Sequence, residues 1–330
     1  MRLDLLVPTF RRPLLLKGTL ESIARAERPR HLEVRVVIVD NDEARGLPGI
    51  EPVMDALPYP AELLHEPAPG KSNALNTAVT RSEADYVGFI DDDEELDARW
   101  FRVVEEALAA GDVEFIGGRS VPKWEGPPPA WIPDDYPAVL GITDMGSEPR
   151  PYGPDAPGML CGGNAVIARQ TLHRIGLFCP ALGPQANRRL FSGEDEDLYL
   201  RLLDAGAWGR YHPDLIIYHR IHPERLTKHY HRAWAFWNGA SKAVLNQQRQ
   251  TSLPRIAGVP RYLYGEAARG LLRHLRLALT PAAAGQRFSA ELSLWHLAGH
   301  LYGRHFPERA SGGRISSAVN AGIRRFPAES

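Results

Sequence analysis

The chain has 330 residues, of which 44% are apolar, 24% charged and 8% aromatic, a composition that is typical of a globular protein with a large core and excludes global disorder. Its 39 basic and 40 acidic residues nearly cancel, so no excess of positive charge indicates a nucleic-acid partner. The balance conceals a split, because residues 255–330 contain 11 arginines and no lysine against 4 glutamates. This part carries +7 and residues 1–254 carry −8, so an acidic body is joined to a basic tail.

The cysteines and the apolar runs bear on the compartment of the protein. Cys161 and Cys179 are too few for a disulfide scaffold and are not spaced as metal ligands, which favours a reducing compartment and leaves a single bridge between them open. The apolar run Met1–Phe10 lacks the long core and the cleavage site of a signal peptide. The best candidate for a membrane span, Leu292–Tyr302, falls short of the roughly 18 to 20 residues that cross a bilayer. We expect a cytoplasmic protein that does not span a membrane.

The first part of the chain alternates short apolar runs with helical segments. The runs Leu3–Val7, Val34–Val39 and Tyr86–Ile90 are rich in β-branched residues and are followed by turn residues, as buried strands are. Helices are predicted at Leu14–Ala26, Ser72–Thr80 and Asp97–Ala110, with Ser72 and Asp97 as N-cap residues. This order predicts a doubly wound α/β unit with a mostly parallel sheet, which binds ligands at the carboxyl ends of its strands.

The pattern changes at Val121. From there to Gly158 ten prolines occur in 38 residues, so we expect a long loop over the sheet. The elements predicted after this loop are a strand at Asn164–Ala168, helices at Gln170–Ile175 and Glu196–Ala205, a strand at Leu215–Tyr218 and a helix from Pro223 to Asn246.

The basic tail beyond Pro254 is predicted to be helical. Apolar residues recur four apart at Leu263, Ala267, Leu271, Leu275 and Leu279, and Arg269, Arg273 and Arg276 lie between them. One interpretation is a helix that binds an anionic membrane surface, together with Leu294, Trp295 and Leu301. The alternative, which we favour, is that the apolar stripe packs on the N-terminal body or forms a homodimer.

An acidic block follows the third predicted strand. In Phe89–Glu95 five consecutive acids come directly after apolar residues, and packed carboxylates repel one another unless a cation lies between them. One interpretation is a solvated turn before the next helix. The other is an oxygen-ligand site for Mg²⁺ or Mn²⁺ that holds a phosphorylated substrate. The position at the carboxyl end of a central strand favours the second interpretation.

A second acidic block, Ser192–Asp197, lies directly before a predicted helix. One or two acids there would complement the helix dipole, but the block contains four. The surplus predicts that at least one carboxylate faces a pocket, where it can serve as a general base for a hydroxyl nucleophile.

Polar residues also follow the first two strands, at Pro8–Arg11 and Asp40–Asp42. Each group alone is typical of a turn, but together with the first acidic block they line one edge of the predicted sheet. The chain contains neither G-x-G-x-x-G nor G-x-x-x-x-G-K-[ST], which argues against a dinucleotide dehydrogenase and a P-loop NTPase. A metal is therefore expected to hold the phosphates.

Six short motifs occur in the order in which they occur in family 2 glycosyltransferases. They are Val7-Pro8-Thr9-Phe10-x-Arg12, Val39-Asp40-Asn41, Gly70-Lys71-Ser72-Asn73-Ala74-Leu75-Asn76, Asp91-Asp92-Asp93, Gly162-Gly163-Asn164 and Gly193-Glu194-Asp195-x-Asp197-Leu198. From about Arg2 to Ser241 the chain resembles this family, whose members are inverting enzymes of the GT-A fold that use nucleotide-diphosphate sugars. One departure is Leu75, where the family commonly has arginine. Lys71 is expected to compensate for that missing phosphate contact.

The resemblance implies a role for each matching residue. The nucleotide-binding residues would be Pro8, Thr9, Arg11, Asp40, Asn41 and Lys71, with Asp91 and Asp92 near the ribose and sugar. Asp93 would be the direct ligand of Mn²⁺ or Mg²⁺, in a metal site that also includes Asp91. Asp195 would be the catalytic base, and Glu194, Gly163 and Asn164 would contact the acceptor or the donor sugar.

Two residues outside these motifs are further candidates. In some relatives a histidine at the position of His219 completes the metal or diphosphate site, and we include it among the metal ligands. Trp131 lies among the prolines of the long loop, where an ordered aromatic wall would suit a carbohydrate acceptor. Arg225 and Arg232 are left open between phosphate contacts and a structural role.

The sequence thus predicts a GT-A catalytic domain at residues 1–250 and a basic amphipathic helical extension at residues 251–330. The expected reaction is inverting transfer of a sugar from a UDP- or dTDP-linked donor to a saccharide or lipid-linked acceptor, assisted by Mn²⁺ or Mg²⁺. A sugar nucleotidyltransferase is the enzymatic alternative, but the segment after the first strand lacks the glycines expected of one. The non-enzymatic alternative is a sugar-nucleotide sensor or scaffold, against which an intact Asp195 argues.

Overall fold

The N-terminal half of the molecule is built on four parallel strands. The computed structural model describes residues 1–44, 46–111, 113–132, 138–153, 160–184, 190–249, 254–278 and 284–311. In it β1 (Arg2–Thr9) lies between β2 (Glu33–Asp40) and β4 (Tyr86–Phe89), and β3 (Ala61–His65) adds to the outer side of β2. The carboxyl ends of these strands therefore meet at one edge of the sheet.

The other half of the same sheet is mixed. β8 (Ala165–Ala168) runs antiparallel to β4 and is followed across the sheet by β6 (Phe115–Trp124), β9 (Gly209–Ile221) and β5 (Glu94–Leu96). β9 is parallel to β6 and antiparallel to β5, and the short β7 (Arg150–Pro151) also pairs with it. Because β5 pairs with β9, the acidic block after β4 is held between the two halves of the sheet.

Helices cover both faces of the sheet, which explains why its parallel strands are apolar on both sides. On one face lie α1 (Pro13–Arg25), α2 (Glu51–Asp55) and α4 (Trp100–Ala109), and their apolar side chains share a core with β1 and β2. On the other face lie α3 (Lys71–Arg81), α5 (Arg169–Ile175) and α6 (Glu194–Asp204). The expected α/β architecture, with a mixed sheet flanked by helices, is confirmed.

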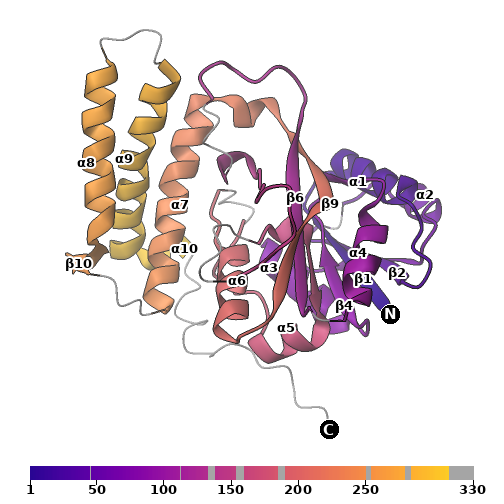
Figure 1. Ribbon diagram of the computed structural model, residues 1–330. Helices are drawn as coiled ribbons and strands as arrows, with labels where there is room; N and C mark the ends of the chain where they lie inside the picture. Colours follow the sequence, from indigo (N-terminus) through magenta and orange to yellow (C-terminus); the bar gives the residue numbers. More distant parts are fainter. Residues whose placement is uncertain are drawn as a thin grey trace.

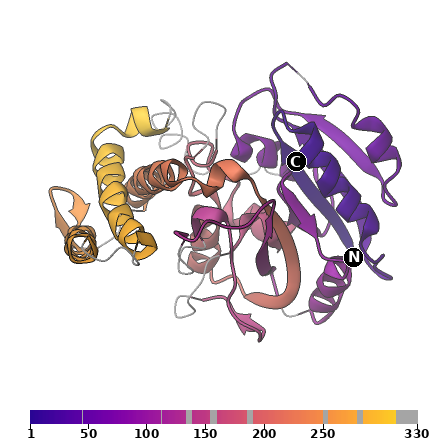
Figure 2. The same cartoon turned by 90° about the horizontal axis from the view of Figure 1, so that it is seen from above.

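The C-terminal part is helical, as expected, and stands beside the sheet (Figures 1 and 2). Its elements are η3 (Pro223–Leu226), α7 (Lys228–Gln248), β10 (Arg255–Ile256), β11 (Val259–Pro260), α8 (Arg261–Leu277), α9 (Ala284–His305) and α10 (Pro307–Ser311). α9 lies between α7 and α8. Among the helices of the described ranges, none combines the length and the apolar character of a membrane span.

Glycines let α9 approach α7 closely. A Cβ atom on Gly299 of α9 would lie 1.8 Å from the carbonyl oxygen of Phe236 on α7, and one on Gly239 of α7 would lie 2.1 Å from the carbonyl oxygen of His296. Backbone atoms cannot give way as a flexible side chain can, so glycine is required at both positions.

Several sequence expectations need correction. The N-cap residues of α3 and α4 are Gly70 and Arg99, and Ser72 and Asp97 are not caps. The Ser72 hydroxyl instead donates to the carbonyl oxygen of Leu182 and ties α3 to the segment before α6.

The long loop expected from Val121 also begins later than predicted, because β6 continues to Trp124. It contains the short helix η1 (Ala138–Leu140) as well as β7. Residues 133–137 and 154–159 of that loop, Leu279 and the tail from residue 312 lie outside the described part of the chain.

Candidate active site

The predicted site residues gather at the carboxyl edge of the parallel strands. Thr9 at the end of β1 is in register with Asp40 at the end of β2, and Asp40 is in register with His65 at the end of β3. β4 ends at Phe89, so the acidic block emerges beside Thr9. Two hydrogen-bonded networks meet at this block, one around Asp92 and Asp93 and the other around Asp91.

The first network surrounds Asp92 and Asp93 with donors. Thr9 Oγ1 donates to Asp92 Oδ2 at 2.8 Å, and Arg12 Nη1 lies 3.3 Å from Asp92 Oδ1 and 3.4 Å from Asp93 Oδ2. Arg225 from η3 donates through Nη2 to Asp93 Oδ2 at 3.0 Å. Asp93 is 4% exposed, so these cations neutralise a carboxylate that water does not solvate.

The two neighbouring carboxyl groups differ in acidity. Burial, followed by the charge of Asp93, raises the pKa of Asp92 to about 7 against the opposing effect of Arg12. Burial would also raise the pKa of Asp93, but the positive charges of Arg225 and Arg12 hold it well below its usual range. Asp93 is therefore the permanently charged member of the pair.

His219 on β9 is fixed in one tautomer by its two hydrogen bonds. Its Nδ1 lies 2.8 Å from the carbonyl oxygen of Leu140, which can only accept, so Nδ1 carries the proton. Its Nε2 accepts from Arg225 Nη1 at 2.9 Å and lies 3.8 Å from Asp93 Oδ1. The Nε2 lone pair is thus engaged by Arg225, beside Asp93. The ring has the tautomer that metal-ligating histidines adopt when a backbone carbonyl accepts from the other nitrogen.

The second network is centred on Lys71, the first residue of α3. Its Nζ lies 2.7 Å from Asp91 Oδ1 and 2.8 Å from Asp91 Oδ2, and 3.9 Å from Glu194 Oε1. Although burial opposes a charge at Lys71, the carboxylates of Asp91, Asp195 and Glu194 raise its pKa well above the ordinary value. Lys71 is therefore a fixed positive charge between the two acidic blocks.

Glu194 and Asp195 open α6 and hold protons more tightly than ordinary acids. Burial, followed by repulsion from Asp195, raises the pKa of Glu194 to about 8, against the opposing charge of Lys71. Burial also raises the pKa of Asp195, with the charge of Asp91 adding to it, while Lys71 and the backbone N–H of Gly162 oppose. Within the described residues Asp195 Oδ1 is buried without a hydrogen-bond partner. A Cβ on Gly162 would lie 2.0 Å from that oxygen, so the Gly162 position must lack a side chain.

Glu94 is a site residue that the sequence did not single out, although it belongs to the first acidic block. It is buried, and its Oε2 accepts from the backbone N–H of Asp91 at 2.8 Å. Gly163 in η2 (Gly162–Asn164) packs on the same carboxyl group, since a Cβ there would lie 2.2 Å from Glu94 Oε2. Burial, followed by the charges of Asp91 and Asp93, raises the pKa of Glu94 well above its ordinary value.

The polar residues after β2 shape loops. The Asp40 carboxylate accepts from the backbone N–H groups of Asp42 and Gly46, and Asn41 bonds three backbone groups of the loop before α3. Arg11 makes a bidentate pair with Asp42 at 2.8 and 2.9 Å.

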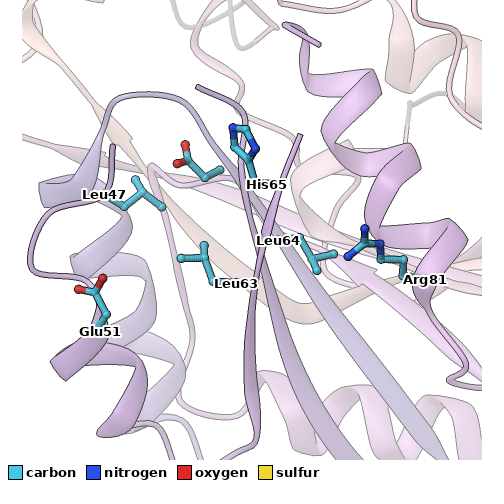
Figure 3. A pocket seen from close by; sticks show the side chains of 7 residues that line it. Leu47, Glu51, Leu63, Leu64, His65 and Arg81 are labelled. Atoms are coloured by element: carbon cyan, nitrogen blue, oxygen red, sulfur yellow. The ribbon is translucent and has the colours of Figure 1, made fainter. Parts of the chain in front are cut away.

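A cavity of about 420 Å³ lies at the outer edge of the sheet, beside β3. Its lining residues, shown in Figure 3, are Asp40, Leu47, Glu51, Leu63, Leu64, His65 and Arg81. Asp40 thus joins the predicted nucleoside region to this cavity.

The geometry gives Asn164 and Trp131 structural contacts. Asn164 is fully buried, accepts from Trp100 Nε1 and donates to the carbonyl oxygens of Arg119 and Leu215. Trp131 packs edge-on against His231 of α7 and Phe288 of α9, with ring centroids 5.0 and 4.9 Å apart. Asn164 therefore holds the strands under the site together, and Trp131 anchors its loop on the C-terminal helices.

The residues present fit a divalent cation that is held partly by the protein and partly by the phosphate oxygens of a bound substrate. Among the described residues no group of three or more His, Cys, Asp or Glu side chains converges as a metal cluster, and Asp91 pairs with Lys71. Asp93 and His219 Nε2 do converge, and a cation bound by few protein ligands completes its coordination with phosphate oxygens and water. An imidazole in the set suits Mn²⁺ better than Mg²⁺.

The pairing of Arg12 and Arg225 with Asp93 was not predicted, although Arg12 lies in the first motif and Arg225 was open to a phosphate contact. Both bind Asp93, yet Arg225 lies 132 positions along the chain from it. Only the pairing of β5 with β9 brings η3 to the acidic block, and no local pattern reports that pairing.

Comparisons with known proteins agree with this geometry. The chain is 29% identical over 296 residues to the succinoglycan biosynthesis protein ExoM of Rhizobium meliloti (strain 1021), covering 86% of this chain and 82% of that protein. It is 26% identical over 266 residues to a pre-mycofactocin glycosyltransferase of Mycobacterium tuberculosis, covering 74% of this chain but only 54% of that longer protein.

Solved structures show the same fold at low sequence identity. The mannosyltransferase PcManGT from Pyrobaculum calidifontis, solved with GDP-Man and Mn²⁺, superposes with a TM-score of 0.59 at 18% identity, covering 91% of this chain and 86% of that one. GalNAc-T7, solved with UDP, GalNAc and Mn²⁺, gives a TM-score of 0.50 at 16% identity, covering 77% of this chain and 52% of that one. The expected GT-A fold is thereby confirmed.

The family model described as "Glycosyl transferase family 2" matches residues 4–176. This range contains most of β1, all of β2 to β4, the loops that follow β1 and β2, and the first acidic block. The chain therefore belongs to glycosyltransferase family 2.

Proposed function

We propose that this glycosyltransferase transfers a sugar from a UDP- or dTDP-linked donor to a hydroxyl group of a saccharide or lipid-linked acceptor, with inversion at the anomeric carbon. Asp195 is the general base of the proposed reaction. The observation that carries this assignment is the buried and unpartnered Oδ1 of Asp195, on a carboxyl group with a raised pKa. An acceptor hydroxyl is a poor nucleophile at neutral pH, and a base with a raised pKa and a free lone pair is suited to remove its proton.

The neighbours of Asp195 support this role. Glu194 has a pKa of about 8, so it is largely protonated at neutral pH and leaves the negative charge on Asp195. The positive charge of Lys71 favours that ionised form without forming a direct ion pair with Asp195. Glu194, as a protonated group, can donate to an acceptor oxygen and orient it.

Asp93 and His219 are the proposed protein ligands of Mn²⁺ or Mg²⁺. When bound, the cation would act as a Lewis acid that stabilises the negative charge of the departing diphosphate. Arg12 and Arg225, which now neutralise Asp93, are placed to contact phosphate oxygens of the donor. Thr9 holds the Asp92 carboxyl group beside them.

The proposal is tested by thermal unfolding of the full chain with UDP, dTDP and GDP, each with and without Mn²⁺. A ligand at 100 times its dissociation constant adds about 2.7 kcal/mol of stability, which gives a clear shift in melting temperature. We expect a shift with UDP or dTDP that increases with Mn²⁺, and loss of the Mn²⁺-dependent part in Asp93→Asn. If none of the three nucleotides shifts the melting temperature, the proposed donor site is contradicted. That result would favour a protein that has kept the fold but does not catalyse transfer.

A further inference from the structure

The outermost helix of the C-terminal part, α8, has apolar residues on the side that faces away from the protein. Leu263, Ala267 and Gly270 are buried where α8 packs against α9 and β11. Leu271, Leu272 and Leu275 are instead 44%, 56% and 58% exposed. Figure 2 shows α8 at the end of the row formed by α7, α9 and α8, with α9 as its neighbour.

The exposed side of α8 combines two stripes. Ala268, Leu271, Leu272 and Leu275 follow one another at helical spacing and form an apolar stripe, and all four are exposed. Arg269, Arg273 and Arg276 are also exposed and recur at intervals of four and three residues beside it. We call these seven residues the outer face of α8.

We propose that the outer face of α8 binds the surface of an anionic lipid bilayer. The helix carries four arginines against the single Glu266, and arginines attract anionic headgroups while adjacent leucines enter the interface. Within the described residues no other element covers these leucines, and a row of exposed leucines on one helix is more than the scattered apolar residues of an ordinary surface.

The charge of the outer face argues against covering it with a second copy of the chain or with the C-terminal residues 312–330. If two copies joined through this face, the arginine stripes of both would be brought into one interface, and like charges at short range are repulsive. Residues 312–330 contain Arg314, Arg324 and Arg325 against the single acid Glu329. That segment therefore lacks the negative charge that would complement the outer face.

The test is flotation of the full chain with vesicles of phosphatidylcholine alone or of phosphatidylcholine mixed with phosphatidylglycerol. We expect binding to the anionic vesicles only, and a decrease when the salt concentration is raised. Removing the arginines in Arg269→Gln/Arg273→Gln/Arg276→Gln is expected to weaken binding about fivefold per arginine. Leu271→Gln/Leu275→Gln is expected to weaken it about fivefold per leucine, because less apolar surface enters the interface.

The controls make the same types of change elsewhere on the surface, with three arginines replaced in one and a single leucine in the other. Arg28→Gln/Arg30→Gln/Arg102→Gln removes three exposed arginines of the catalytic part, and Leu14→Gln changes a leucine of α1 that is 81% exposed. Both controls are expected to bind vesicles as the unchanged protein does. Equal losses in the controls and in the α8 variants would show that net charge or general apolarity, rather than this face, determines binding.

Two further outcomes would overturn the proposal. One is failure of the unchanged protein to float with anionic vesicles. The other is a dimer in sedimentation equilibrium that Leu271→Gln/Leu275→Gln dissociates, since a second copy would then cover the face. The nucleotide-dependent shift in melting temperature, measured on the same variants, keeps this question separate from the reaction proposed above, on which the inference does not depend.

Discussion

Among the acids of the site, Asp195 differs from its neighbours in what its oxygens contact. Asp91 pairs with Lys71, Asp93 pairs with arginines, and Glu94 accepts from a backbone N–H group. Asp195 Oδ1 has no such partner in the described part of the chain. A carboxylate oxygen that is already engaged is a weaker base, so this residue is the one whose removal should affect proton transfer most directly.

Asp195→Asn should therefore lower kcat by about 10²- to 10⁴-fold. An amide cannot take the proton of the acceptor hydroxyl, while the residues around Asp93 keep the donor site. The measurement is the transfer rate together with the nucleotide-dependent shift in melting temperature, which we expect to persist. Asp204→Asn, at the exposed carboxyl end of the same helix, is the matched control and should transfer normally. Near-normal turnover in Asp195→Asn would remove the assignment of the base.

The raised pKa of Glu194 predicts a pH-dependent stability. The folded chain keeps a proton on Glu194 up to about pH 8, whereas the unfolded chain releases it near the ordinary value of 4.5. The stability that protonated Glu194 contributes is therefore fully present below its pKa in the unfolded chain. It is lost as the pH rises through its pKa in the folded chain. Glu194→Gln, which keeps a neutral side chain, should gain stability relative to the unchanged protein between these two pH values, by a few kcal/mol. Chemical denaturation at a series of pH values measures this, and parallel curves for the two proteins would contradict it.

Arg225 lies where a divalent cation is proposed to bind, so the two should compete. Arg225→Gln removes a positive charge 3.0 Å from Asp93 and vacates His219 Nε2. We expect about tenfold tighter binding of Mn²⁺ in the absence of nucleotide, together with weaker binding of the nucleoside diphosphate. Titration followed by electron paramagnetic resonance of free Mn²⁺ measures the first effect. Arg232→Gln, which breaks a pair with Glu291 on α9, should change neither, and an unchanged Mn²⁺ affinity in Arg225→Gln would count against the proposed ligands.

The sequence was informative about residues that lie in motifs and much less so about the contacts that tertiary pairing creates. Thr9, Lys71, Asp93, Glu194 and Asp195 all lie at the predicted edge, because strand ends and helix starts can be read from local pattern. Arg12 lies in a motif and Arg225 was open to a phosphate contact, but their shared pairing with Asp93 depends on which strands pair, and hydrophobic pattern does not determine sheet order. The roles given to Asp93, Asp195 and the nucleotide-binding residues remain predictions, since they came from the family resemblance.

At the scale of elements, the crossing of α7 and α9 depends on glycines. Gly299→Ala places a Cβ 1.8 Å from a backbone oxygen of α7, so the helices must separate, and we expect a loss of about 1 to 3 kcal/mol in the free energy of unfolding. Gly265→Ala on α8 is the matched control, because the atom nearest to its added Cβ belongs to the flexible Arg269 side chain at 3.3 Å. This control should stabilise the protein by up to about 1 kcal/mol through helix propensity. Denaturant unfolding measures both, and equal effects would contradict the close contact.

The elements that sequence pattern missed are short or atypical. β5 has three residues, of which two are glutamates, and β6 contains two glycines and a proline, so neither resembles an alternating apolar strand.

The apolar face of α8 was also assigned wrongly. Residues four apart on an α-helix drift by about 40° at each step, so Leu263 and Ala267 face inward whereas Leu271 and Leu275 have rotated out to the surface.

For the whole molecule, the proposed boundary at residue 250 can be tested by truncation. Ala235 of α7 packs with Phe288 and Leu292 of α9, and Ala310 of α10 packs with Ala240 and Val244 of α7. A chain that ends at residue 250 exposes this side of α7. We expect it to melt at least several degrees lower than the full chain, because each buried apolar side chain contributes about 1.5 to 3 kcal/mol. Differential scanning calorimetry measures the difference, and an unchanged melting temperature would show that residues 1–250 are a self-sufficient domain.

The pairing of β5 with β9 has a consequence for how the protein is made. The carboxylate of Asp93 leaves the ribosome more than a hundred residues before Arg225, which pairs with it, and before His219, which lies beside it. Contacts between residues so far apart in sequence form slowly, because a long loop must close first. During synthesis the strands β1, β2 and β4 can assemble while Asp93 is still without these two partners. The catalytic edge is thus completed only when the last strand of the sheet has been translated.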